Sequence, residues 1–398
     1  MKLIKRETYL NELRSLLNTP DIKVITGVRR SGKSKLLEEL SEEIVKKDKS
    51  ANIIHINFNL TEFEGLLKYH ALEDYVEKSF KKSKNNYLLV DEVQMCDCFE
   101  KAINSLHAKE KYDIYVTGSN AFLQSSDLAT LFVGRTYEIH ILPFSFKEYI
   151  TYFPSDNLYG SLTKYITEGG MAGSYLFTKV EQKYRYINTE VLNALIVRDI
   201  VKKNKLRNEP LLHELIVFLM DNIGNIVSVR SITDTLSQNK INADHKTVGK
   251  YMDHLCKAYA FYRIRRYDIK GKRYLQSEDK YYLSDHSFKY ARLGTKDMDY
   301  GHVLENIVAL ELIRRGFEVY IGVLRNKEID FVAIKQGEKM YIQVAYDISE
   351  QKTFDREVSP LLDIKDAFPK MLIARTYQPE YKHEGIRIID VAEWLRND

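Results

Sequence analysis

Apolar residues in the first third of the chain follow two different spacings. Short runs at residues 22–25, 87–90 and 112–117 are rich in Ile, Val, Leu and Tyr, which is typical of strands buried in a sheet. Apolar residues between the first two runs recur at helical intervals over residues 36–45. The pattern predicts an α/β domain in which strands alternate with helices around a parallel sheet.

Helical spacing dominates the middle of the chain, where it covers residues 155–204 and several shorter stretches. Two short helices joined by a polar turn within residues 229–258 are typical of a helix-turn-helix. Residues 261–276 then predict a β-hairpin whose tip needs the conformational freedom of Gly271. We therefore expect a winged helix in this part of the chain.

The final quarter returns to an alternation of helix and strand. A helix over residues 301–315 ends at Gly316, and three strands follow within residues 318–346. A further helix and two short strands complete this part of the chain. The pattern predicts a second α/β domain at the C-terminus.

The composition is that of an ordinary globular protein. Of 398 residues, 44% are hydrophobic and 29% are charged, and the formal net charge is only +4. Any nucleic-acid surface must therefore be local. No apolar run approaches the ~20 residues that span a bilayer. Because the first residues turn polar too early for a signal peptide, we expect a cytoplasmic protein with no membrane partner.

Residues 27–34 connect the first predicted strand to the first helix and read Gly-Val-Arg-Arg-Ser-Gly-Lys-Ser. In a loop with this spacing, backbone N–H groups surround phosphate oxygens, the lysine reaches the outer phosphates and the final hydroxyl ligates Mg²⁺. The sequence therefore predicts a site for ATP and Mg²⁺. The expected nucleotide contacts are Gly27, Arg30, Ser31, Gly32, Lys33, Ser34 and Lys35.

A second motif supplies carboxylates for this site. The run at residues 87–90 ends in Asp91 and Glu92. We expect Asp91 to hold Mg²⁺ together with Ser34, as an acid at a strand end does in such sites. Glu92 is placed to polarise an attacking water, which favours hydrolysis over simple nucleotide binding.

Two further residues are candidates for catalysis. Ser119 follows the third strand, where a hydroxyl can sense the terminal phosphate or cap the next helix. Arg135 stands at the opening of a loop and could stabilise phosphoryl charge, within the chain or from a neighbouring subunit, or be a solvated loop residue. Mass measurement with and without ATP would separate a monomer from a ring or dimer.

These motifs together resemble those of prokaryotic AAA-type ATPases whose P-loop domain precedes a C-terminal domain of unknown function with a restriction-endonuclease-like core. The resemblance extends over the whole chain and rests on residues 27–34, 90–94, 117–119, 134–135 and 142–146. It implies a P-loop core at 1–152, a helical lid at 153–206, a winged helix at 207–290 and a restriction-endonuclease-like domain at 291–398. It also implies that Arg6 and Tyr9 lie against the adenine.

The predicted hairpin is the candidate surface for duplex DNA. Basic residues and tyrosines alternate along it, in a chain that has 28 Tyr and a single Trp. Such a ribbon could follow a phosphate backbone, or its charges could simply be solvated. The candidate contacts are Arg263, Arg265, Arg266, Lys270, Lys272 and Arg273.

Nuclease chemistry is a weaker alternative. A nuclease of the restriction-endonuclease type holds Mg²⁺ with a helix Glu, an Asp on the second strand, and a Glu and a Lys on the third. This chain offers Glu305 and Asp330, but Gln343 stands at the third acid and Ala345 at the lysine. With metal ligation reduced and the cation for the nucleophilic water absent, we expect a domain that kept the fold and lost the chemistry.

The favoured hypothesis is an ATPase that passes nucleotide-driven movement to its winged-helix and C-terminal modules, acting on DNA or a protein partner. The alternatives are a nucleotide-gated DNA-binding module and, less favoured, a Mg²⁺-dependent nuclease.

Overall fold

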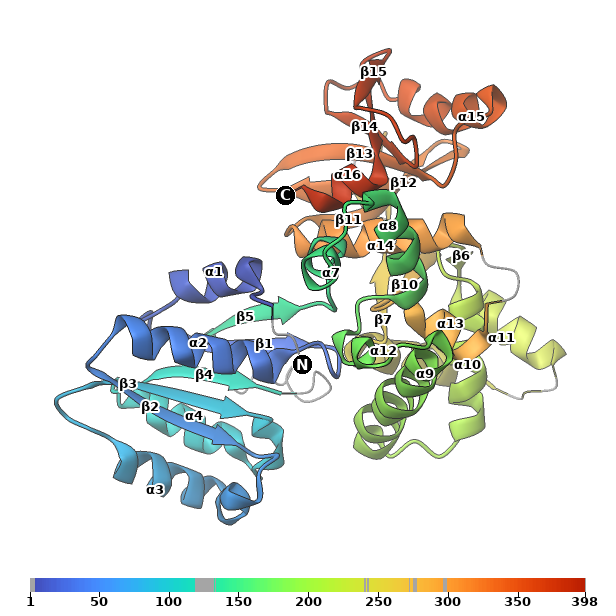
Figure 1. The fold of residues 1–398 in the computed structure, drawn as a ribbon. Helices are drawn as coiled ribbons and strands as arrows, with labels where there is room; N and C mark the ends of the chain where they lie inside the picture. The colour runs from blue at the N-terminus through green and yellow to red at the C-terminus, as the bar shows by residue number, and fades with distance from the viewer. Residues whose placement is uncertain are drawn as a thin grey trace. The chain divides into compact units, whose positions relative to one another are not determined.

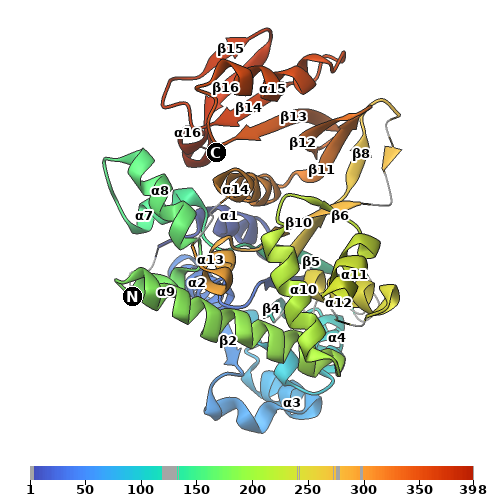
Figure 2. The ribbon, with the colours of Figure 1, turned by 90° about the vertical axis from the view of Figure 1, so that its right-hand side faces the viewer.

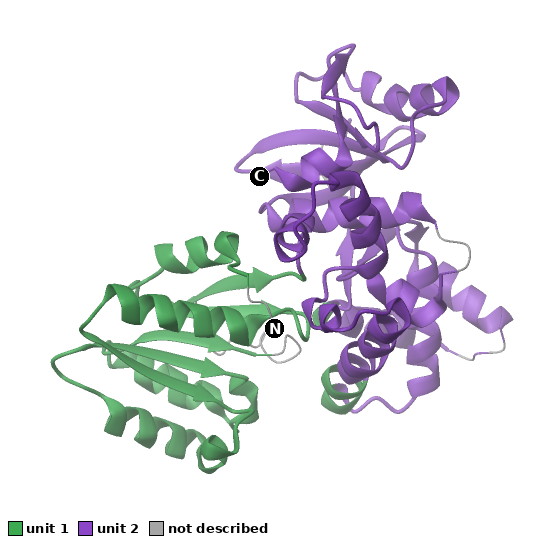
Figure 3. Cartoon of the chain, in the orientation of Figure 1, with its two compact units in different colours: residues 1–143, 197–203, 257–259 green, residues 144–196, 204–256, 260–398 purple. Residues whose placement is uncertain are grey.

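The computed structural model describes residues 4–118, 132, 134–239, 241, 243–271, 273–274, 278–295 and 299–397, with backbone only at 273–274. The chain folds into two compact units, which Figure 3 distinguishes by colour. Unit 1 comprises residues 1–143, 197–203 and 257–259, and unit 2 comprises residues 144–196, 204–256 and 260–398. In the part of the chain that the structure describes, no helix is both long and apolar enough to cross a bilayer.

Unit 1 is built on a five-stranded sheet with the order β2-β3-β4-β1-β5, in which every pairing is parallel (Figure 1). This confirms the predicted parallel sheet. Its strands are β1 (Ile22–Gly27), β2 (Ala51–Asn57), β3 (Asn85–Asp91), β4 (Asp113–Thr117) and β5 (Thr136–Ile141). Its helices are α1 (Glu7–Ser15), α2 (Lys33–Lys47), α3 (Tyr69–Ser79) and α4 (Phe99–Ala108).

Helices cover both faces of this sheet because its central strands are apolar on both sides. Val24 of β1 packs with residues of α3 and α4, whereas its neighbour Ile25 packs with residues of α1 and α2. Successive strand residues point to opposite faces, so a continuous apolar run serves two cores. β4 lies between β1 and β3, which brings the carboxyl ends of these three strands together at one edge.

Helices fill the first part of unit 2. They are α7 (Phe146–Tyr152), α8 (Leu158–Glu168), α9 (Val180–Tyr186), α10 (Glu209–Asp221), α11 (Val229–Gln238) and α12 (His245–Lys257). A three-stranded antiparallel sheet of order β6-β10-β7 accompanies the last three helices. Its strands are β6 (Ile226–Val227), β7 (Phe261–Ile264) and β10 (Asp279–Leu283).

The C-terminal part of unit 2 contains an eight-stranded sheet of order β15-β16-β14-β13-β12-β11-β8-β9. Its strands are β8 (Arg266–Asp268), β9 (Arg273–Tyr274), β11 (Glu318–Leu324), β12 (Lys327–Lys335), β13 (Glu338–Ala345), β14 (Lys370–Ala374), β15 (Tyr381–His383) and β16 (Ile386–Asp390). The helices of this part are α13 (Ser287–Leu293), α14 (Tyr300–Arg314), α15 (Gln351–Leu362) and α16 (Val391–Arg396). Figure 2 shows α14 and α15 on opposite faces of the sheet.

The predicted hairpin over 261–276 divides between the two sheets of unit 2. β7 pairs with β10, whereas β8 pairs in parallel with β11 and antiparallel with β9. The hairpin around Gly271 therefore forms between β8 and β9, but at the edge of the large sheet and not with β7, and a winged helix stays a prediction. Tyr267 and Ile269 explain the difference, because both are buried in the core that α15 and the large sheet share. Apolar burial draws this segment onto the sheet edge.

Candidate functional site

The loop between β1 and α2 has the backbone that phosphate binding requires. Arg30 and Gly32 have positive φ values of 67° and 98°. A side chain at Gly27 would place its Cβ 2.2 Å from the carbonyl oxygen of Ile141, so only glycine fits there. α2 begins at Lys33, and no side chain caps its first turn, because the residue before it is Gly32. The N–H groups of the first turn are thus available to an anion, which the helix dipole also attracts.

Lys33 is buried against its own loop. Its ammonium donates to the carbonyl oxygens of Gly27 at 2.9 Å and Val28 at 3.2 Å. Burial lowers the pKa of Lys33, while Glu92, Asp199 and Asp91 oppose this shift. These three carboxylates therefore lie close enough to Lys33 to influence its pKa.

Asp91 lies at the carboxyl end of β3 and is only 1% exposed. One carboxylate oxygen accepts a hydrogen bond from the hydroxyl of Thr117 at the end of β4. The other oxygen is buried and has no partner among the described residues. An unpaired buried carboxylate oxygen is costly unless it meets a cation or water. Thr117 is a site residue that the sequence analysis passed over in favour of Ser119, which lies outside the described residues.

Glu92 is held in a restricted backbone conformation, with φ 55° and ψ 47°. Gln94 fixes its side chain, because the Gln94 amide donates to a Glu92 carboxylate oxygen at 2.5 Å. The Glu92 amide donates to Thr117 Oγ1 at 3.2 Å. A non-glycine residue with positive φ persists only where its surroundings compensate for the strain, as they often do at functional sites.

The donor set suits a Mg²⁺ that is bound mainly through phosphates and water. Among the described residues there is no group of three or more His, Cys, Asp or Glu that could hold a metal ion by itself. Mg²⁺ commonly uses one or two protein oxygens and completes its octahedron with water and substrate phosphates. The unpaired oxygen of Asp91 and the hydroxyl of Ser34 at the start of α2 are of this kind.

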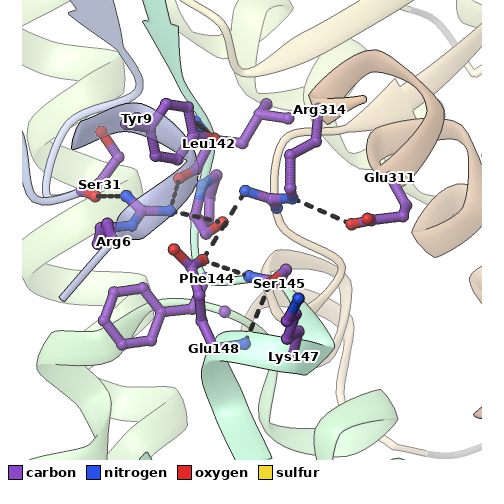
Figure 4. Close-up of polar contacts among 12 residues, drawn as sticks. Arg6, Tyr9, Ser31, Leu142, Phe144, Ser145, Lys147, Glu148, Glu311 and Arg314 are labelled. Carbon is purple, nitrogen blue, oxygen red and sulfur yellow. Dashed lines mark hydrogen bonds and ion pairs between the residues drawn. The ribbon is translucent and has the colours of Figure 1, made fainter. Parts of the chain in front are cut away.

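Arg6 and Tyr9, expected near the adenine, are engaged inside unit 1 (Figure 4). The Arg6 guanidinium donates to the carbonyl oxygens of Ser31 at 2.9 Å and Leu142 at 2.8 Å, and it lies 4.6 Å from the Tyr9 ring centre. Tyr9 accepts a hydrogen bond from the Leu142 amide at 3.1 Å. Arg6 thereby ties the phosphate loop to the end of β5. Contact with the adenine stays a prediction for both residues.

Arg135 lies at the sheet edge opposite the phosphate loop. It precedes β5, whose first residue Thr136 pairs with Ile22 at the start of β1, while Gly27 at the end of β1 pairs with Ile141. Five strand steps of ~3.3 Å separate the two edges, roughly 16 Å of backbone. This separation argues against a catalytic role of Arg135 at the phosphate loop of its own chain, and a role from a neighbouring subunit stays a prediction.

Asp199 is a site residue that the sequence analysis missed. It belongs to the segment 197–203 of unit 1 and is 6% exposed, while its neighbour Arg198 is exposed. The surrounding turns, Leu195–Lys202, form a π-helix. A π-helix is wider than 3.6 residues per turn, so ordinary helical periodicity assigns its inward face incorrectly.

Replacing Asp199 by Asn is expected to tighten ATP binding roughly fivefold at about pH 8 and to change it little at about pH 5. Burial raises the pKa of Asp199 to about 6, against the opposing influence of Arg29 and Lys33. Above this pH the carboxylate is charged and repels a polyphosphate, and below it the side chain is neutral like Asn. Calorimetric titration of both proteins across this range is the measurement, since their difference cancels the titration of ATP. Equal affinity at high pH would contradict the expectation.

The remaining nucleotide candidates and the expected DNA contacts are mostly at the surface. Arg30 and Lys35 are exposed, and Lys35 pairs with Glu38 at 2.5 Å. Arg263 and Arg266 pair with Asp253 and Glu278, at 3.3 Å and 2.5 Å. Arg265 and Lys270 are exposed. Lys272 lies outside the described residues, and only the backbone of Arg273 is described, so DNA contact stays a prediction.

Unit 2 buries a second polar cluster around Glu305 of α14. The ammonium of Lys280 on β10 lies 2.9 Å from Glu305 and 2.6 Å from Glu328, and the hydroxyl of Tyr282 donates to Glu305 at 2.6 Å. Asp330 of β12 is buried nearby, and burial together with the charge of Glu305 raises its pKa well above the usual range.

Lys280 corrects the expectation that these acids have no accompanying cation. Ala345 stands where nucleases of this type have a lysine on the third strand. The ammonium of Lys280 reaches the cluster from β10 instead. The sequence analysis missed Lys280 because it lies 25 residues before Glu305, on a strand of the other sheet. Since Lys280 is 3% exposed and Glu305 6%, these two groups belong to the interior of unit 2.

Comparison with protein families finds an AAA domain at residues 19–150 and a domain of unknown function at residues 159–299. The first match covers the phosphate loop, Asp91 and Glu92. The second covers α8 to α13 together with the three-stranded sheet.

Two curated relatives align with nearly the full chain. An uncharacterised protein of Haemophilus influenzae is 36% identical over 397 residues, which are 99% of this chain and 98% of that protein. An uncharacterised protein of Methanocaldococcus jannaschii is 28% identical over 382 residues, 90% of this chain and 82% of that protein. Among solved structures, AMPPCP-bound DnaA from Aquifex aeolicus is similar at a TM-score of 0.31 and 16% identity, over 64% of this chain and 90% of that chain.

Proposed function

We propose that this chain binds Mg²⁺–ATP in the loop before α2 and hydrolyses it. The chain belongs to the same family as the Haemophilus influenzae protein, and its residues 19–150 form the AAA domain of a P-loop ATPase. The observation that carries this proposal is the meeting of Lys33, Asp91 and Glu92 at one sheet edge, with one buried Asp91 oxygen left without a described partner. A loop suited to phosphate, a carboxylate oxygen suited to a metal and a candidate base together support this proposal.

Each residue has a distinct role in this proposal. Lys33 exchanges the carbonyl oxygens of Gly27 and Val28 for phosphate oxygens, which bind an ammonium more strongly because they are charged. Ser34 and Asp91 hold Mg²⁺, which neutralises charge that develops on the phosphates. Glu92, positioned by Gln94, orients water and accepts its proton. Thr117 orients Asp91 through its hydroxyl.

Asp199 connects this site to the rest of the chain. Its segment, residues 197–203, belongs to unit 1, yet residues 144–196 before it and 204–256 after it belong to unit 2. A polyphosphate next to Lys33 repels the Asp199 carboxylate and favours displacement of its segment. In this proposal, nucleotide binding moves the helical turns that continue into unit 2, which is how a switch ATPase transmits its nucleotide state.

Replacing Lys33 by Ala tests the proposal. The variant is expected to lose roughly 100-fold in affinity for ATP, because a charge-assisted contact to the outer phosphates disappears. Isothermal titration with Mg²⁺–ATP measures this, and release of phosphate measures hydrolysis. Lys46→Ala, on the same helix with a side chain 73% exposed, is the matched control and should bind normally. Unchanged binding and hydrolysis in Lys33→Ala would refute an ATP site at this loop.

A further inference from the structure

Five planar side chains form a continuous row in unit 2. Tyr300 stacks on Tyr346 with ring centres 5.1 Å apart and planes 26° apart. The Arg375 guanidinium lies 4.9 Å from the Tyr346 ring and 5.4 Å from the Tyr377 ring. Tyr377 in turn lies 4.8 Å from Tyr159 of α8. The row therefore places a cation between two aromatic faces, with further rings at both ends.

A pocket of about 320 Å³ opens beside this row. It is lined by residues 346–349 after β13, residues 375–378 after β14, and Tyr381. β13 and β14 are parallel neighbours, so both loops leave the sheet at the carboxyl edge, where open α/β sheets commonly bind ligands. The volume lies within the range of small-molecule sites.

Arg375, which lines this pocket, has hydrogen-bonding capacity left. One terminal nitrogen donates to the Tyr346 hydroxyl and the other to Thr163 Oγ1 at 3.2 Å. Its Nε is buried and has no partner among the described residues. Because a buried unpaired donor costs free energy, the arrangement favours an acceptor supplied by a ligand.

Two tyrosines at the pocket are exposed, and hydrogen bonds hold the backbone of one of them. Tyr377 is 55% exposed and Tyr381 is 38% exposed. Tyr377 has a positive φ of 55°. A carboxylate oxygen of Asp390 accepts hydrogen bonds from the amides of Thr376 at 2.9 Å and Tyr377 at 2.8 Å, which fixes this backbone. Large exposed aromatic groups on a fixed backbone are typical of a binding surface.

The charges of the pocket limit the ligand. Asp347 lines it together with Arg375, and the Ser349 amide, hydrogen-bonded to Asp347 at 2.8 Å, lowers the pKa of that carboxyl. One positive and one negative side chain give little net attraction for a polyphosphate. A planar ring next to a single phosphate suits this chemistry better, because the ring stacks and the phosphate accepts from Arg375.

We propose that the Arg375–tyrosine row is a binding site for a nucleotide unit, in which a base stacks on the exposed tyrosines and its phosphate accepts a hydrogen bond from Arg375. The source of this unit is either single-stranded nucleic acid or a free mononucleotide. The site is independent of the phosphate loop of unit 1, and its test does not depend on ATP hydrolysis.

Two probes distinguish the sources. One is a fluorescein-labelled oligothymidine of fifteen nucleotides, whose binding is measured by anisotropy. The other is AMP, whose binding is measured by calorimetry. Both are titrated against the full chain in EDTA at low salt. Tyr377→Ala and Arg375→Gln are expected to weaken binding roughly tenfold, as loss of one stacked base contact does. Arg375→Lys, which keeps the charge but lacks the planar fork, should weaken it as well. Tyr75→Ala, which removes a 40% exposed tyrosine of unit 1, is the control.

Thermal unfolding of each variant shows whether it is folded, and the exposed Tyr377 is the substitution least able to disturb the fold. Oligothymidine binding that both substitutions weaken supports a single-strand site. AMP binding with the same dependence, without oligothymidine binding, supports a mononucleotide site. The proposal is overturned if neither probe binds, or if binding is equally strong in folded Tyr377→Ala and Arg375→Gln proteins.

Discussion

Replacing Glu92 by Gln is expected to slow ATP turnover by roughly 10²–10⁴-fold while ATP affinity changes by less than a few fold. Gln has nearly the same shape as Glu and can keep the 2.5 Å contact with Gln94 after rotation of its amide. It cannot accept a proton from water, so only the chemical step suffers. Single-turnover hydrolysis and equilibrium binding of ATP separate the two effects.

Glu62→Gln is the matched control, because this exposed glutamate of unit 1 lies outside the site. It should turn over ATP at the native rate. Native turnover in Glu92→Gln would show that Glu92 is not the base. A loss of ATP affinity as large as the loss of turnover would instead assign Glu92 to nucleotide binding.

Replacing Lys280 by Met is expected to destabilise unit 2 by about 3–5 kcal/mol, the usual cost of removing one partner of a buried ion pair. In a domain of this size the unfolding temperature falls by roughly 10 °C. Burial alone lowers the pKa of Lys280, but Glu305, Asp330 and Glu328 together raise it. The stabilisation by the charged Lys280 is therefore fully present below about pH 10.4, the pKa of a lysine in the unfolded chain. It is lost only at higher pH. Calorimetric unfolding is the measurement.

The double variant Lys280→Met with Glu305→Gln should recover much of this loss, because it no longer buries an uncompensated carboxylate. Lys327→Met is a second control. This lysine pairs with Asp363 at 2.7 Å, but both side chains are exposed, at 42% and 51%. It should cost less than about 1 kcal/mol. Equal effects of Lys280→Met and Lys327→Met would mean that burial adds nothing to the Lys280 pair.

The nucleotide site could be predicted from sequence because its chemistry is local. Eight consecutive residues form the phosphate loop, and Asp91 and Glu92 follow a strand without interruption. Because the strands of a parallel sheet run in the same direction, their carboxyl ends lie together at one edge. The predicted sheet of unit 1 was confirmed for this reason, and Lys33, Asp91 and Glu92 meet where the spacing indicated.

The tyrosine excess shows the limit of such reasoning. Tyr267, which falls on the predicted DNA-binding ribbon, is buried in unit 2. Exposed tyrosines of unit 2 instead lie near Arg375, in a row whose members come from segments more than 200 residues apart. Adjacency in sequence says which side chains are neighbours along a strand, but not which face of the strand the core covers.

The sequence by itself determined the phosphate loop, its acids and the strand–helix alternation that presents them, because each depends on residues within one turn or one strand. Only the tertiary structure decided that Asp199 faces Lys33, that Arg135 lies at the opposite sheet edge and that Lys280 neutralises Glu305. Strand order, the register of a π-helix and the pairing of buried charges arise from contacts between distant segments. Burial selects these contacts, and no local pattern of residue types specifies them.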